Sequence, residues 1–76
     1  MKDVKITLKA LRVLYGLTQE QAGKLIGVSK DTWSNYENSK RFPNSNKLKE
    51  ISRVFNISLD SIIFEKNIRL KRINQR

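Results

Sequence analysis

The 76-residue chain contains neither cysteine nor histidine. Without cysteine it has no disulfide framework and offers no thiolate. Without histidine it lacks the commonest metal ligand and the usual general base near neutral pH. The 7 acidic residues show no paired-carboxylate or metal-ligand spacing, and the chain has no glycine-rich phosphate loop. We therefore predict no metal site and no cofactor, and an enzyme is the least favoured class.

Long apolar runs and acidic residues are also scarce. No run approaches the roughly 20 apolar residues of a membrane-spanning helix, and the N-terminus lacks the apolar core of a signal peptide. We therefore expect a cytoplasmic protein with no membrane partner and no small-molecule ligand. Lysine and arginine total 16 against 7 acidic residues, a net charge of +9. This excess favours an anionic partner, with nucleic acid the usual one and an acidic membrane surface the competing one.

Residues 19–38 contain the most informative pattern in the chain. Thr18, followed three residues later by Gln21, forms a capping-box pattern, which begins a helix by satisfying free backbone N–H groups. Gly27 tolerates the left-handed conformation of a tight turn. Ser29 is suited to cap a second helix. The segment therefore predicts two short helices joined by a turn.

The second of these helices has two different faces. Trp33 and Tyr36 lie one turn apart on an apolar face. Gly23, in the first helix, predicts a close approach of the second, since glycine in a helix interior otherwise costs roughly 1 kcal/mol. The opposite face is polar and consists of Lys30, Asp31, Ser34, Asn35 and Asn38. Such a helix fits the major groove of B-DNA, where asparagine suits adenine, lysine suits guanine and aspartate accepts a hydrogen bond from cytosine.

The segment resembles the helix-turn-helix of the lambda-repressor-like (Cro/cI, XRE-like) DNA-binding domains. That pattern has glutamine first, glycine ninth, and small or apolar residues at defined positions between and after them. Counting from Gln19, the pattern is filled by Ala22, Gly23, Ile26, Gly27, Val28, Trp33 and Tyr36. The resemblance covers about residues 6–63 and implies an all-α fold of five short helices. One departure is Ser39, which stands where the family usually has glycine after the recognition helix.

The other three helices are predicted from capping residues and apolar spacing. They are expected at residues 8–15 after Thr7, at residues 45–55 after Asn44, and at residues 59–63 after Ser58. Asn56 suits the left-handed position that follows the longest of them. Phe42, in the loop after the recognition helix, is expected to pack inward.

The chain divides into a helix-turn-helix domain at residues 1–63 and a basic tail at residues 64–76. Val4 and Ile6 alternate with polar residues, as the residues of a strand do, and Ile68 and Leu70 alternate with charged residues in the tail. One interpretation pairs these two segments as strands, since the ends of a small domain often lie close together. The other is a basic tail that lies near DNA.

The resemblance and the polar face together predict the residues that contact DNA. The expected base contacts are Lys30, Asp31, Ser34 and Asn35, and the expected phosphate contacts are Gln19, Thr32, Asn38, Lys40 and Arg41. The alternative for each of them is an ordinary solvated surface. Asp31 is unusual so close to phosphates, and two interpretations stay open: it reads cytosine, or it excludes other sequences by repulsion.

Glu37 lies near the C-terminal end of the recognition helix, where a negative charge opposes the helix dipole. It therefore needs a cation nearby. Similar domains place an arginine of the first helix against this glutamate, and Arg12 stands at that position. The resemblance thus implies a partly buried, bidentate salt bridge that fixes the recognition helix.

These observations predict a sequence-specific transcriptional regulator of bacterial or phage type that binds double-stranded DNA. Because one small domain buries limited surface on DNA, we expect a homodimer on a two-fold operator with half-sites about 10 base pairs apart. The candidate dimer surface consists of Leu59, Ile62, Ile63, Phe64 and Ile68. The alternatives are an antitoxin or other protein-binding module with secondary DNA binding, and an RNA-binding domain, which would place stacking aromatics on the polar face.

Overall fold

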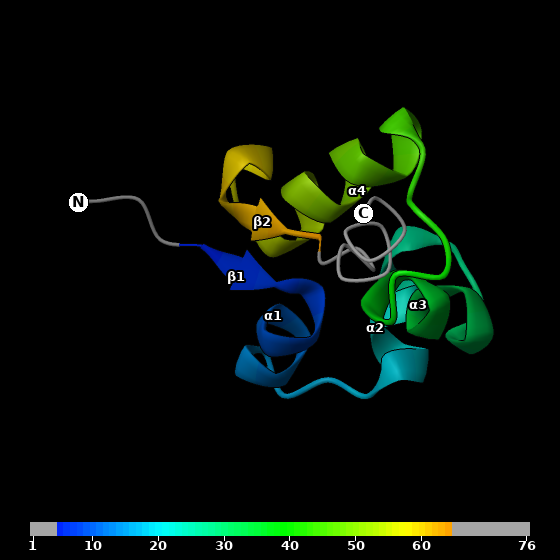
Figure 1. Cartoon of the computed structure of the whole chain (residues 1–76). Coiled ribbons are helices and arrows are strands. Elements are labelled where there is room, and N and C mark those ends of the chain that lie inside the picture. Colours follow the sequence, from blue (N-terminus) through cyan, green and yellow to red (C-terminus); the bar gives the residue numbers. More distant parts are fainter. Residues whose placement is uncertain (1–4, 65–76) are drawn as a thin grey trace, which may run out of the picture.

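The computed structural model describes residues 5–64, which form a bundle of short helices and a pair of short strands (Figure 1). In chain order the elements are β1 (Ile6–Thr7), α1 (Leu8–Leu14), α2 (Gln19–Ile26), α3 (Lys30–Glu37), α4 (Ser45–Phe55), a 3₁₀ helix (Leu59–Ser61) and β2 (Ile62–Ile63). Of the predicted basic tail, residues 65–76 lie outside the described part of the chain. None of the helices in the described part is long and apolar enough to cross a membrane.

Each α-helix of the described chain begins after a residue whose side chain accepts a hydrogen bond from a backbone N–H one turn later. These capping residues are Thr7, Thr18, Ser29 and Asn44. Thr18 forms the full capping box, because the side-chain oxygen of Gln21 accepts in return from the backbone N–H of Thr18 at 2.9 Å. The contacts satisfy donors that a helix start leaves free. The four predicted caps are confirmed.

The predicted fifth helix at residues 59–63 is wrong. Only Leu59–Ser61 form a short 3₁₀ helix, and the chain then continues as β2, which is parallel to β1. The register places Ile62 opposite Ile6 and Ile63 opposite Thr7. Isoleucine is β-branched and favours an extended backbone, and Ile62 is buried in the core. Pairing with distant residues therefore outweighs the local helix signal, and the described chain has four α-helices.

The same pairing refines the predicted pair of terminal strands. A strand is present at Ile6–Thr7, and its partner in the described chain is β2. Val4, where the predicted strand begins, lies outside the described residues. The predicted partners in the tail, Ile68 and Leu70, lie outside the described residues.

The core is formed by buried residues of all four α-helices and of β2. Trp33, Ile51 and Phe55 are its most deeply buried large apolar side chains, with exposed fractions of 0%, 0% and 1%. Phe42 does not pack inward as predicted, since it is 56% exposed and its ring lies 4.8 Å from that of Phe64. Pro43, the next residue, is fully buried. The buried apolar residues that complete the core are Leu8, Leu11, Ala22, Ile26, Tyr36 and Ile62.

Ser39, two residues after α3, has a left-handed backbone with φ 63°. Asn56, after α4, has φ 53°, which confirms its predicted conformation. A side chain with a Cβ atom costs roughly 1 kcal/mol in this region of backbone space, and asparagine tolerates it better than serine.

Replacing Ser39 with glycine is expected to raise the free energy of unfolding by about 0.5–1 kcal/mol, because glycine adopts a positive φ without the Cβ clash. Urea denaturation followed by circular dichroism measures the change. Asn56→Gly is the matched control, and its gain should be smaller. A loss of stability in Ser39→Gly would contradict the prediction.

Candidate nucleic-acid interface

A tight turn holds α2 and α3 close together. Gly27 has φ 80°, the left-handed conformation predicted for it. The backbone N–H of Val28 donates to the carbonyl oxygen of Gly23 at 2.9 Å. A Cβ atom on Gly23 would lie 2.8 Å from the carbonyl oxygen of Val28. The predicted close approach at Gly23 is therefore made by the backbone of the turn that leads into α3.

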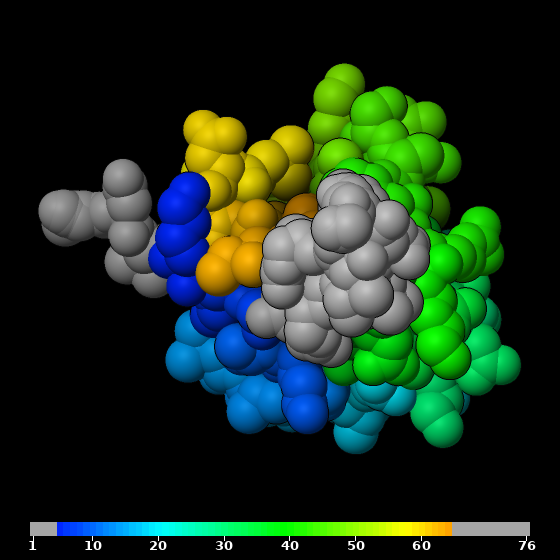
Figure 2. Space-filling view, viewed as in Figure 1, coloured from blue at the N-terminus to red at the C-terminus, as the bar shows by residue number. Residues whose placement is uncertain are grey.

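α3 presents one face to the core and the other to solvent. Trp33 is fully buried and Tyr36 is 7% exposed, as the apolar face requires. On the other face Lys30, Asp31 and Asn38 are exposed, and Thr32, Ser34 and Asn35 are half-buried. The space-filling view places α3 and the loop after it, coloured teal to green, on the side of the molecule away from β1 (Figure 2). The polar face of α3 is thus on an outer surface.

The polar side chains of α3 differ in whether they bond to the protein itself. Ser29 Oγ donates to Thr32 Oγ1 at 3.1 Å, and Asn38 Nδ2 donates to Ser34 Oγ at 3.3 Å. Within residues 5–64, the polar side chains of this face that make no hydrogen bond or ion pair are those of Lys30, Asp31 and Asn35. These three groups are available for an external partner without breaking a bond inside the described chain.

The loop after α3 folds back onto the end of that helix. The backbone N–H groups of Lys40 and Arg41 donate to the carbonyl oxygen of Asn35 at 2.9 and 3.3 Å. Both side chains are exposed. Two positive charges are therefore held beside the polar face of α3, where the phosphates that flank a DNA groove would lie.

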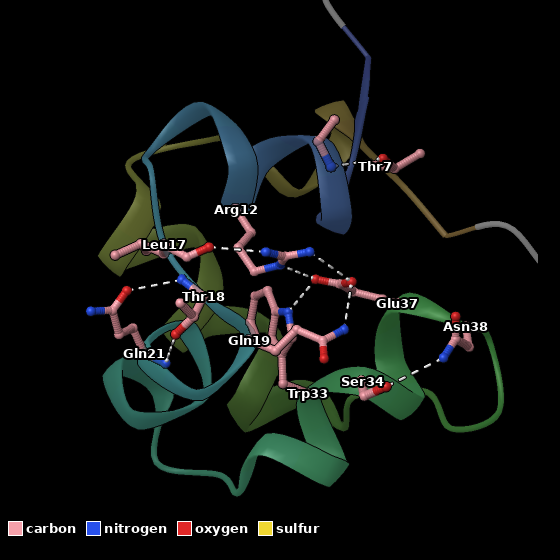
Figure 3. Close-up of polar contacts among 11 residues, drawn as sticks. Thr7, Arg12, Leu17, Thr18, Gln19, Gln21, Trp33, Ser34, Glu37 and Asn38 are labelled. Atoms are coloured by element: carbon pink, nitrogen blue, oxygen red, sulfur yellow. Dashed lines mark hydrogen bonds and ion pairs between the residues drawn. The ribbon is translucent and has the colours of Figure 1, made fainter.

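The end of α3 is tied to α1 and α2 through Glu37, whose side chain is only 4% exposed. Arg12 Nε donates to Oε2 at 2.6 Å, and Arg12 Nη2 donates to Oε1 at 3.4 Å. Gln19 Nε2 donates to Oε1 at 3.1 Å, and the indole N–H of Trp33 donates to Oε2. Figure 3 shows these donors converging on one carboxylate from three helices. The bidentate Arg12–Glu37 pair implied by the resemblance is thus part of a larger network.

Two opposing effects act on the pKa of Glu37. Burial raises it, since desolvation disfavours the charged form. The hydrogen bonds from Arg12, Trp33 and Gln19, together with the positive charge of Arg12, outweigh burial and hold the pKa below its usual value. Arg12 is itself fixed by a bond from Nη1 to the carbonyl oxygen of Leu17 at 2.9 Å. The ionised carboxylate therefore anchors the end of α3 to the rest of the bundle.

Gln19 has a structural role that the sequence analysis did not predict. From the sequence, Gln19 is expected to contact a phosphate, whereas in the structure its side-chain amide donates to Glu37. The hydrogen bond from Trp33 to Glu37 is also absent from the sequence predictions. The spacing could have indicated it, because residues four apart lie on the same side of one helix.

Two contacts to helix ends hold the scaffold behind α3. Lys47 Nζ donates to the carbonyl oxygen of Ile26 at 2.9 Å, which places a positive charge at the C-terminal end of α2, where the helix dipole is negative. The hydroxyl of Tyr15 donates to the carbonyl oxygen of Phe55 at 2.7 Å and so links the ends of α1 and α4. Neither contact is predictable from sequence spacing alone.

Two helices joined by a glycine turn, with a polar outer face on the second and exposed cations beside it, define a helix-turn-helix domain. The chain belongs to the helix-turn-helix family, whose sequence profile matches residues 8–62. This match confirms the predicted resemblance to Cro/cI-type and XRE-like domains.

Three transcription regulators are similar to this chain over 56 residues, or 74% of its length. The transcriptional activator BcrR of Enterococcus faecalis is 38% identical, and the aligned segment is 28% of that protein. The regulators YobD and ImmR of Bacillus subtilis are 34% and 32% identical, over 50% and 44% of their lengths. The chain thus spans half or less of these relatives. Together with the family match, they confirm the predicted class, a helix-turn-helix domain of the kind found in transcription regulators.

Proposed function

We propose that this chain recognises a specific sequence in double-stranded DNA and regulates transcription by occupying an operator, as a regulator of bacterial or phage type. One observation carries the proposal. The side chains of Lys30, Asp31 and Asn35 make no hydrogen bond or ion pair within the part of the chain that the structure describes, while Trp33 and Glu37 anchor the same helix from behind. A helix held in this way loses little freedom on binding.

In this proposal α3 enters the major groove. Its base contacts are Lys30, Asp31, Ser34 and Asn35, and the phosphate contacts are Gln19, Thr32, Asn38, Lys40 and Arg41. For Ser34 and Thr32, a contact with DNA requires that a hydroxyl already bonded within the protein be shared. For Gln19, the contact falls to the free backbone N–H groups at the start of α2, because the side-chain amide donates to Glu37.

The names of the relatives support a regulatory function, since they describe one transcriptional activator and two transcriptional regulators. Occupying an operator is sufficient to block or recruit polymerase, so the proposal includes no catalytic step and no cofactor. It places the protein in the cytoplasm, where bacterial DNA is accessible.

We also propose that two copies bind one operator. Leu59 and Ile63 are 39% and 38% exposed and are the surface residues available for such a contact, whereas Ile62 is 8% exposed and belongs to the core. Phe64 is half-buried, and Ile68 lies outside the described residues. A two-fold dimer would place its two α3 helices on half-sites about 10 base pairs apart. Gel mobility on duplexes with one or two half-sites tests this arrangement.

Selection of binding sites from random duplexes tests the proposed function. Asn35→Ala is expected to lose preference at one base position, at a cost of about 1–3 kcal/mol on the selected site. Lys30→Ala should act in the same way if it reads a base. Lys40→Ala is expected to weaken binding to all sequences alike and to lower the slope of log affinity against log salt by about one. The control is Lys9→Ala, which removes an exposed charge at the start of α1 and should leave the base preference unchanged.

A wild-type protein that selects no sequence, and binds duplex DNA no better than other polyanions, would contradict the function. The function would also be contradicted if both Asn35→Ala and Lys30→Ala selected the full wild-type motif. Circular dichroism of each variant shows that it is folded, so that a loss of binding is assigned to the contact removed.

The protein-binding alternative is favoured by one observation. Val13 and Leu14, at the end of α1, are 58% and 71% exposed, and exposed apolar surface marks a protein interface where it forms a contiguous patch. Val13→Lys and Leu14→Lys variants that regulate a reporter normally would exclude this face from the function.

A further inference from the structure

Asp31 is the second residue of α3, and its carboxylate is exposed. The ion pairs in the described part of the chain are Arg12–Glu37 and Arg53–Glu50, so Asp31 belongs to none. The residues one turn away on its helix are Ser34 and Asn35, and neither is a cation. Within residues 5–64, no cation therefore pairs with this negative charge.

The helix dipole explains an acidic residue in the first turn. It does not explain why Asp31 lies between Lys30 and Ser34, on the face of α3 that is proposed to enter the major groove. Glu20 occupies the first turn of α2 and supplies the same favourable charge without lying on the α3 face. Placed in a major groove, an ionised carboxylate meets phosphates that repel it and base edges that are mostly acceptors. It accepts hydrogen bonds and donates none.

Only two bases offer a donor to such a group in the major groove. Cytosine presents its N4 amino group, and adenine presents its N6 amino group next to the N7 acceptor. Guanine and thymine present acceptors at the corresponding positions, O6 with N7 and O4, which repel a carboxylate. Adenine N6 has an acceptor on each side, its own N7 and the O4 of the paired thymine, whereas cytosine N4 has one, the O6 of the paired guanine. Cytosine is therefore the base that suits Asp31 best.

We infer that Asp31 is a specificity-determining residue: it accepts a hydrogen bond from a cytosine of the operator half-site and rejects other bases at that position. This inference rests on the proposed function and adds to it the identity of one base pair. Asn35 lies one turn further along α3, with Cβ atoms roughly 5–6 Å apart for residues so spaced. Since base pairs are about 3.4 Å apart, Asn35 reads a base one or two steps from the cytosine. Asp31 contributes discrimination and lowers affinity for other sequences.

Site selection with wild type, Asp31→Ala and Asp31→Asn tests the inference, with Asp60→Asn as the control. Asp60 is an exposed acid in the 3₁₀ helix, so its replacement changes the net charge as Asp31→Asn does but at a site far along the chain from α3. The wild-type motif is expected to contain a nearly invariant cytosine. Changing that C·G pair to T·A should weaken wild-type binding roughly 5- to 150-fold.

The variants should separate charge from base recognition. Asp31→Ala should lose the cytosine preference, bind the T·A site almost as well as the C·G site, and bind random duplexes more tightly than wild type. Asp31→Asn should shift the preference at that position towards adenine, the base that asparagine suits. Asp60→Asn should keep the cytosine and gain less affinity for random duplexes than Asp31→Ala gains.

A sharp wild-type motif in which Asp31→Ala retains the same base at every position overturns the inference and leaves the proposed function intact. So does a motif with no cytosine that responds to the substitution. A wild type that selects no motif at all overturns the proposed function and this inference with it. Thermal unfolding of each variant shows that the folded protein is being compared.

Discussion

Replacing Trp33 with alanine is expected to lower the free energy of unfolding by about 3–5 kcal/mol, a large share of the roughly 4–11 kcal/mol available to a domain of this length. The side chain is fully buried and its ring centroid lies 6.0 Å from that of Phe55. The substitution leaves a cavity between α3 and α4 that the surrounding helices fill only in part. It also removes a donor to Glu37.

Trp33→Phe separates the two losses. Phenylalanine fills most of the cavity but has no N–H, so its cost should be smaller, about 1–3 kcal/mol, and should come mainly from the acceptor left with one donor fewer. Urea denaturation followed by circular dichroism is the appropriate measurement, because Trp33 is the single tryptophan of the chain and its fluorescence is absent in both variants. Equal costs for the two substitutions would show that packing of the indole ring contributes little.

DNA binding should follow the same order. Trp33→Ala should bind an operator in proportion to its folded fraction, whereas Trp33→Phe, folded at low temperature, should bind nearly as well as wild type. A Trp33→Ala protein that is fully folded and still loses its operator would instead indicate that the residue acts directly on DNA, contrary to its position in the core.

The bounds of α2 and α3 are predictable from the sequence because their signals are local. Thr18 and Ser29 each bond to a backbone group three residues later, and Gly27 supplies the left-handed turn between the helices. The pairing of Arg12 with Glu37 follows from a negative charge at a helix C-terminus and from the family resemblance. In each case a few neighbouring residues, or one helix end, determine the geometry.

Other features depend on residues far away in the chain, and local patterns do not reveal them. Residues 59–63 have a plausible helix cap, yet Ile62 and Ile63 pair with β1 at the other end of the domain. Gln19 is a residue typical of a solvated helix start, but the fold places Glu37, at the end of α3, beside its side chain. Lys47 resembles a surface lysine until the position of the end of α2 is known. The loop at Phe42 depends on which of two adjacent apolar residues, Phe42 or Pro43, faces the core.

Replacing Glu37 with alanine is expected to cost about 3–5 kcal/mol, because it breaks a buried ion pair by removing one partner. Arg12, whose side chain is 14% exposed, would keep only the carbonyl of Leu17 as an acceptor. The indole N–H of Trp33 and the amide of Gln19 would lose theirs. Glu37→Gln keeps the shape and one good acceptor, so its cost should be smaller. The matched control is Glu50→Ala, which removes the exposed Glu50–Arg53 pair and should cost about 0–1 kcal/mol.

The Glu37 network should also make stability depend on pH in the acid range. Since the pKa of Glu37 is lowered in the folded protein by its hydrogen bonds and by Arg12, against the effect of burial, the unfolded chain takes up a proton first as pH falls. The contribution of Glu37 is therefore fully present above the ordinary glutamate pKa of about 4.5 and is lost as pH falls through the lowered value of the folded state. Urea denaturation at a series of pH values should show the gap between wild type and Glu37→Gln constant above this range and shrinking below it. Glu50→Gln should show no comparable change. A wild-type advantage over Glu37→Gln that persists unchanged in strong acid would mean that shape and packing, rather than the ionised carboxylate, hold the end of α3 in place.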